Sequence, residues 1–133
     1  MHEILPVLPS LIMSLFIAIL FIQSGLDKVF DWSGNLSWLN GHFSKTFLSP
    51  FVSIMLVTIT VTELAAGFTA AAGIIYYFIA KSTVVIFFAG VLSALSITAL
   101  FFGQRVAKDY AGAAVLVPYF ILMILLMVLS YPR

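Results

Sequence analysis

Hydrophobic residues follow one another along this chain in four long runs that are separated by polar segments. The runs cover residues 8–26, 51–76, 82–102 and 111–131. Each is close to the length of about 20 apolar residues that a membrane-spanning helix needs. The segments between the second and third runs and between the third and fourth are short, which is typical of antiparallel helix pairs. The pattern predicts an all-α membrane protein, with residues 1–133 forming a single four-helix bundle.

The segment that joins the first two runs is longer than a simple turn requires. It contains Trp32, Trp38, Phe43 and Phe47 among glycine, serine and asparagine residues. Tryptophan concentrates where a membrane meets water. We therefore expect an interfacial loop with short helices that lie along the membrane surface and cover one end of the bundle. An anchor of this kind is the favoured interpretation, and a lid over a substrate site is the alternative.

Composition and charge agree with the membrane class. Hydrophobic residues make up 63% of the chain and charged residues 8%, whereas a soluble domain has about 25% charged residues. The formal net charge of +1 is too small for a nucleic-acid-binding surface. The expected surroundings are the lipid bilayer, crossed several times, and the chain is not expected to bind nucleic acid.

The chain contains no cysteine, which excludes disulfides, thiolate metal sites and a dithiol–disulfide relay. The two histidines are His2, near the start of the chain, and His42, in the long interfacial segment. A haem held between membrane helices needs axial ligands at depth, and neither histidine is placed to supply one. No ligand set for haem, flavin or a metal is evident.

Glu63 interrupts the second apolar run near its middle. A charged group at such a depth costs about 2.5–3.5 kcal/mol on insertion scales. Glu63 shares a helical face with a series of small residues, since positions three and four apart lie on one side of a helix. These small residues are Ala66, Gly67, Ala70 and Ala71. Small residues mark close helix packing in membranes, so Glu63 is expected to point into the bundle.

Similar small-residue stripes are expected on the other three spans. They consist of Ser14, Ala18 and Gly25 in the first, of Ala89, Gly90, Ser93 and Ser96 in the third, and of Ala111, Gly112, Ala113 and Ala114 in the fourth. Ordinary helix packing is sufficient to explain most of these positions.

The sequence offers several partners for Glu63. Lys28 faces the right way, but it follows the first run, and Glu63 lies some twelve residues, roughly 18 Å, below the same membrane face. Gln23 lies at a better depth but points away from the small residues. Thr60, Ser93, Ser96 and Thr98 are neutral candidates. We therefore expect no direct pair with Lys28, and a Glu63 carboxyl that is protonated or hydrogen-bonded, because burial disfavours its charged form.

Two short motifs resemble those of the DoxX-like family of small four-helix membrane proteins. Residues 21–28 read F-I-Q-S-G-L-D-K, similar to the family's F-x-x-S-G-x-x-K, and residues 63–67 read E-L-A-A-G, similar to its E-L-x-x-G. The family often has an arginine at the start of the first span, and residues 11–14 contain none. The resemblance directs attention to seven candidate functional residues: Gln23, Ser24, Gly25, Asp27, Lys28, Glu63 and Gly67.

The resemblance implies a subunit of the cytoplasmic (inner) membrane that accompanies other membrane subunits, in some relatives within complexes that pass electrons to quinone. Three functions stay open at this point. The first is an accessory subunit of a quinone-linked redox complex, in which quinone is the possible cofactor and a partner supplies the electrons. The second is a scaffold of a non-redox assembly, and the third, less favoured, is a small proton-coupled transporter. Whether the chain is itself an enzyme is not decided by these residues.

Overall fold

The computed structural model describes residues 3–132, and its regular elements are all helices. They are α1 (Leu8–Phe30), α2 (Trp32–His42), α3 (Val52–Ala80), α4 (Val84–Val106) and α5 (Tyr110–Ser130), with a single 3₁₀ turn at Ser49–Phe51 before α3. The helices α1, α3, α4 and α5 are long and apolar enough to cross a membrane. The all-α, multi-pass prediction is therefore confirmed.

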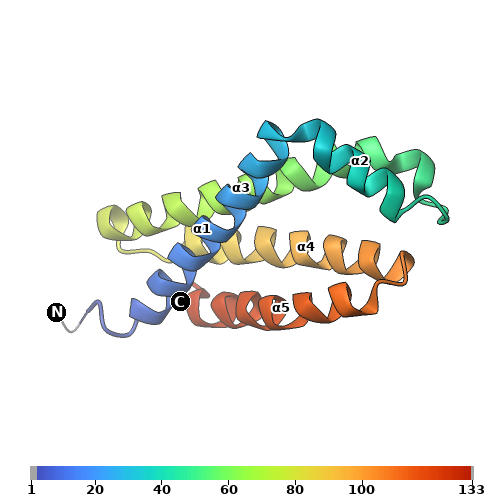
Figure 1. Ribbon diagram of the computed structural model, residues 1–133. Helices are drawn as coiled ribbons and strands as arrows, with labels where there is room; N and C mark the ends of the chain where they lie inside the picture. Colours follow the sequence, from blue (N-terminus) through green and yellow to red (C-terminus); the bar gives the residue numbers. More distant parts are fainter. Residues whose placement is uncertain (1–2, 133) are drawn as a thin grey trace.

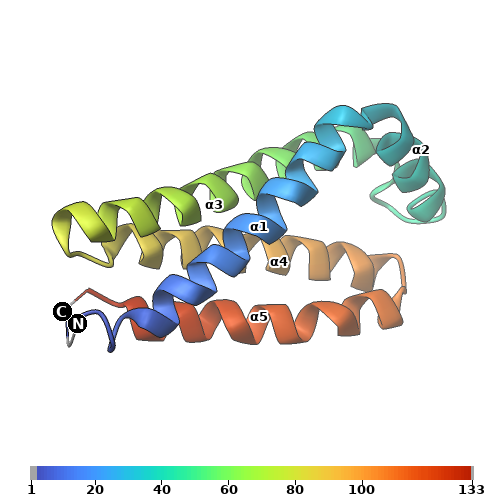
Figure 2. The ribbon, with the colours of Figure 1, turned by 60° about the vertical axis from the view of Figure 1, so that its left-hand side comes forward.

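The four long helices form a bundle in which one helix runs at an angle to the others. Helices α3, α4 and α5 follow one another as antiparallel neighbours, and α1 crosses them obliquely (Figures 1 and 2). The main contact of α1 is with α3. Helix α2 lies at the end of the bundle where α3 begins and α4 ends (Figure 1). The short helix that we expected between the first two spans is thus present.

The first span is longer than its apolar run predicts. We expected it to end at residue 26, but α1 continues to Phe30 and ends at Asp31, whose backbone N–H donates to the Asp27 carbonyl. Asp27 and Lys28 therefore lie in the last helical turn, where the lysine is favourable next to the helix C-terminus. Helix α3 likewise runs four residues past its expected end, to Ala80, and stops where Lys81 adopts a left-handed conformation (φ 56°).

The core of the bundle follows the predicted small-residue stripes in three of the four spans. The stripe residues of α1 and α4 are all buried, and so are those of α3 except the half-buried Ala71. The Ser14 hydroxyl donates to the Ala70 carbonyl 2.9 Å away and joins α1 to α3. The prediction is wrong for α5, where only Ala113 of the four small residues is buried. Helix α5 packs chiefly on α4, so most of its surface is left for lipid.

Candidate functional site

Two glycines allow α1 and α3 to approach closely. A Cβ atom added to Gly67 would lie 2.8 Å from the backbone nitrogen of Ile22, and one added to Gly25 would lie 2.5 Å from Cδ2 of Leu64. Both distances are shorter than atoms tolerate, so only glycine fits without a shift. We call this contact the α1–α3 seam, defined by Gly25 and Gly67 with Leu64 and Ile22.

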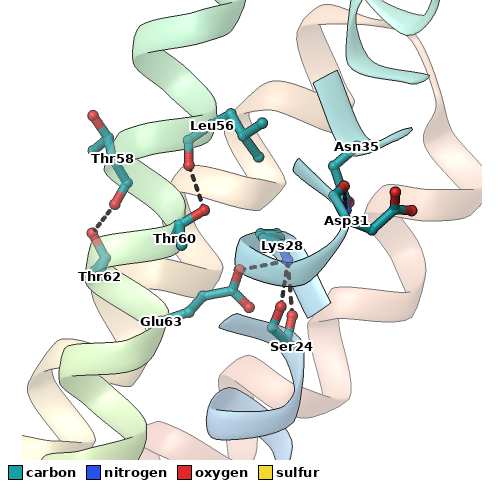
Figure 3. A network of polar contacts seen from close by, with 9 residues as sticks. All are labelled: Ser24, Lys28, Asp31, Asn35, Leu56, Thr58, Thr60, Thr62 and Glu63. Carbon is teal, nitrogen blue, oxygen red and sulfur yellow. Dashed lines mark hydrogen bonds and ion pairs between the residues drawn. The ribbon is translucent and has the colours of Figure 1, made fainter. Parts of the chain in front are cut away.

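Lys28 and Glu63 form an ion pair next to this seam. The Lys28 Nζ atom lies 2.7 Å from Oε1 of Glu63, and the side chains are 18% and 2% exposed (Figure 3). The ammonium also donates to the Ser24 hydroxyl at 2.9 Å and lies 3.4 Å from the Ser24 carbonyl oxygen. Ser24 is one helical turn before Lys28, so the helical phase of α1 directs both side chains toward α3. The three residues form one polar group inside an apolar bundle.

The expectation that Lys28 lies too near the surface to reach Glu63 is wrong. That expectation assumed that the end of α1 and the beginning of α3 lie at the same depth in the membrane. In the structure α1 crosses α3 obliquely (Figure 2), and its last turn brings Lys28 beside Glu63 (Figure 3). The chain then continues from Asp31 into α2, which lies toward the beginning of α3 (Figures 1 and 2). Helix α2, and not the end of α1, therefore spans the distance between the depth of Glu63 and the beginning of α3.

The neutral partners that we expected for Glu63 are engaged elsewhere. Four hydroxyls each donate to the carbonyl oxygen four residues earlier in their own helix, at 2.6–2.9 Å: those of Thr60, Ser93, Ser96 and Thr98. Such bonds satisfy a buried hydroxyl locally. The partner of Glu63 is therefore the charged Lys28 and none of these hydroxyls.

The seven candidate residues fall into two groups. Lys28, Glu63 and Ser24 are in contact, and Gly25 and Gly67 shape the seam beside them. The other two candidates, Gln23 and Asp27, are exposed on the outer side of α1. The helical phase of the first span predicted the outward direction of Gln23 correctly. The structure thus gathers five of the seven residues at one place.

The carboxylate of Glu63 keeps unused hydrogen-bonding capacity. Its Oε1 atom is buried and lies within ion-pair distance of Lys28, yet no described group donates a hydrogen bond to it in a suitable direction. A buried polar atom that lacks such a bond is unusual in a folded protein. A carboxylate accepts at both oxygens and donates when it is protonated. Among the described residues, Glu63 therefore depends on the Lys28 ammonium group as its partner.

A second polar cluster was missed in the sequence. The ring Nε2 of His42 lies 2.7 Å from Oε1 of Gln104 and 3.9 Å from Oδ2 of Asp109. These three residues, the rim cluster, join the end of α2 to the end of α4 and the start of α5. The only signal for it was that Gln104 and Asp109 flank the short segment between the third and fourth apolar runs. Nothing in the sequence placed His42 beside them.

Over residues 3–132, no three histidine, aspartate or glutamate side chains gather closely enough to hold a metal ion. Comparison of the chain with protein-family models, with curated proteins and with solved structures finds no match.

Proposed function

We propose that this chain is an integral membrane subunit of a redox complex that passes electrons to quinone in the cytoplasmic membrane, and that it is related to the DoxX-like proteins. The observation that carries this proposal is the Lys28–Glu63 pair, 2.7 Å apart between two apolar helices, with Glu63 only 2% exposed. Ionisable residues inside a membrane bundle are expensive and typically mark a path for ions, protons or a polar ligand. The two motifs that resemble the family meet at this pair.

Lys28 is the more exposed member of the pair, at 18%, so a ligand with carbonyl oxygens would reach the pair at its ammonium group. Lys28 donates hydrogen bonds, and Ser24 holds its ammonium group in place at 2.9 Å. Glu63 accepts a proton in its charged form and donates one in its neutral form. Quinone, when bound, would supply two-electron, two-proton redox chemistry. Glu63 and Lys28 would pass protons taken from water to its oxygens, while a partner subunit would provide the electrons.

The test is a Glu63→Gln substitution in the complex purified from its own membranes. Glutamine keeps the shape and the hydrogen bonds of the side chain but carries no exchangeable charge. We expect the complex to assemble and its reduction of a short-chain ubiquinone analogue to fall at least tenfold, within the range that general acid–base groups contribute. The matched control is Glu3→Gln, which makes the same change at an exposed position. Unchanged quinone reduction by the Glu63→Gln complex would overturn the proposal.

A scaffold for a larger membrane assembly is the second candidate, and the α1–α3 seam favours it. Close contact at two glycines holds two membrane helices together. The ion pair beside it then stabilises the packing of α1 on α3. In that case Glu63→Gln lowers the amount of assembled complex, while the activity of each assembled complex stays the same. Blue native electrophoresis combined with activity per complex separates the two candidates.

A further inference from the structure

A cavity of about 310 Å³ opens beside the rim cluster, away from the Lys28–Glu63 pair. It lies between α3 and α4 and is covered by α2 and the segment that follows α2. Its size falls within the range of about 300–1,000 Å³ that is usual for small-molecule sites. None of the functions considered for the Lys28–Glu63 pair uses it.

The cavity has a polar end and an apolar shaft. His42 and Gln104 line the end near α2. The shaft follows α3 as far as Thr62, about ten residues or roughly 15 Å from the start of that helix. Its walls are mainly aliphatic and aromatic side chains from α2, α3 and α4: Leu39, Ile54, Met55, Ile59, Leu100 and Phe102.

Polar side chains are few in the shaft, and they are the threonines Thr58 and Thr62. Thr62 lines the cavity, but its hydroxyl donates to the Thr58 carbonyl at 2.6 Å. The shaft therefore suits a hydrocarbon chain. At about 310 Å³ the cavity has room for one hydrocarbon chain and not for the two chains of a phospholipid.

The polar end presents a hydrogen-bond acceptor. Nε2 of His42 and the amide oxygen of Gln104 share a hydrogen bond at 2.7 Å. In the neutral tautomer that donates from Nε2 to this oxygen, Nδ1 is an acceptor. No group in residues 3–132 hydrogen-bonds to that Nδ1 atom. The ring is held by Trp38, stacked on it at 4.4 Å, and by the edge of Phe43 at 5.1 Å. An acceptor that is held in place in this way can receive a hydrogen bond from the hydroxyl group of a ligand.

Charge at the polar end disfavours an anionic head group. The Asp109 carboxylate lies 3.9 Å from His42 Nε2, and its side chain is 36% exposed. A negatively charged head group at His42 would lie close to this carboxylate, and like charges repel. A head group without charge avoids that repulsion.

We propose that this cavity binds a neutral single-chain lipid with a hydroxyl head group, of the monoacylglycerol class. Its hydrocarbon chain lies in the shaft between α3 and α4, and a head-group hydroxyl donates to Nδ1 of His42. This site is separate from the Lys28–Glu63 pair and does not depend on the function proposed for that pair.

Tryptophan fluorescence tests the proposal directly, because Trp38 lines the cavity and the chain has only one other tryptophan. A Trp32→Phe background leaves Trp38 as the sole reporter. The protein is reconstituted in phosphatidylcholine vesicles and titrated with a dibrominated monoacylglycerol, whose bromine atoms quench a tryptophan that they touch. We expect saturable quenching, well above that by dibrominated phosphatidylcholine at the same bromine content. Equal, non-saturating quenching by both lipids would overturn the proposal.

An Ala99→Phe substitution blocks the shaft. Ala99 lines the cavity and its side chain is exposed, so a larger residue is accommodated without unfolding the bundle. We expect the saturable quenching to disappear. The matched control is Ala114→Phe, which adds the same ring at an exposed position of α5 outside the cavity and leaves the quenching intact. Persistence of saturable quenching in Ala99→Phe contradicts the assigned location.

A His42→Phe substitution tests the head-group contact. Phenylalanine keeps a ring beneath Trp38 and removes Nδ1. We expect monoacylglycerol to bind about three- to tenfold more weakly, as for the loss of one hydrogen bond. The brominated methyl ester of the same chain, which has no hydroxyl, should bind both proteins equally. A brominated alkyl sulfate should bind the unsubstituted cavity more weakly than monoacylglycerol does, and tighter binding of the sulfate contradicts the neutral head group.

Discussion

The Lys28–Glu63 pair and the rim cluster are both polar groups set among apolar helices, but the first is closed and the second is open. Glu63 is 2% exposed and lies beside a seam where the helix backbones nearly touch. His42 and Asp109 are 17% and 36% exposed, and a cavity opens next to them. A charged side chain that is shielded from solvent is stabilised only by its partner, whereas an exposed one is also stabilised by water. The loss of a charged contact should therefore lower the free energy of unfolding much more at the Lys28–Glu63 pair than at the rim cluster.

The largest effect is expected when the closed pair loses one member. Lys28→Met leaves the Glu63 carboxylate buried without a counter-charge, and we expect the free energy of unfolding to fall by about 3–5 kcal/mol at neutral pH. Steric trapping or denaturant unfolding in bicelles measures this loss.

The double variant Lys28→Met/Glu63→Leu is the control for this prediction. Replacement of both members of a buried pair by apolar residues is often nearly neutral. We expect the double variant to recover most of the stability that the single variant loses. If the cost of the double change equals the sum of the costs of Lys28→Met and Glu63→Leu alone, the two side chains are not coupled and the closed-pair interpretation is wrong.

The next effect concerns the seam that closes the pair. In Gly67→Ala the new methyl group meets the backbone of α1 at Ile22, which cannot rotate away. We expect a loss of about 1–3 kcal/mol, as for overpacking in a core. In Gly25→Ala it meets the side chain of Leu64, whose end is flexible, so the loss should be smaller. Thermal unfolding in detergent ranks the variants.

Gly41→Ala is the matched control for the seam, because nothing lies within 4 Å of a Cβ atom at that position in α2. Alanine there should be neutral or should stabilise helix α2 by about 0.5–1 kcal/mol. A destabilisation by Gly41→Ala equal to that by Gly67→Ala would contradict the assignment of the Gly67 effect to close packing.

The contrast between the two places also marks how far the sequence could predict this molecule. Four spans, a short interfacial helix and an inward Glu63 follow from apolar run length and helical phase. The Lys28–Glu63 pair did not follow, because it depends on the angle at which α1 crosses α3. That angle is set by contacts between Gly25, Gly67 and residues of the opposite helix. Run length carries no information about it.

The open cluster was harder still to predict. His42 meets Gln104 only because α2 and the segment after it fold back over the ends of α3 and α4. The two residues are 62 positions apart, and the segment between α2 and α3 has no periodic pattern. Helical phase predicts which residues share a face within one span. It does not predict which loop residue returns to which helix end.

The smallest effect is expected at the open cluster itself. The Asp109 carboxylate accepts a hydrogen bond from the backbone N–H of Gly112 at 2.9 Å and so caps α5, while its 3.9 Å contact with His42 is partly solvated. Asp109→Asn keeps the cap, since asparagine caps helices about as well as aspartate. It removes only the exposed charge contact, for which we expect less than about 1 kcal/mol.

Asp109→Ala removes the cap as well and should cost about 1 kcal/mol, the usual value for a lost N-cap. Unfolding of the two variants side by side therefore separates the cap from the charge. If Asp109→Asn destabilised the protein by several kcal/mol, as Lys28→Met is expected to do, the rim cluster would be as closed as the buried pair. A hydroxyl head group would then have no open acceptor to reach, so this small effect also bears on the lipid site.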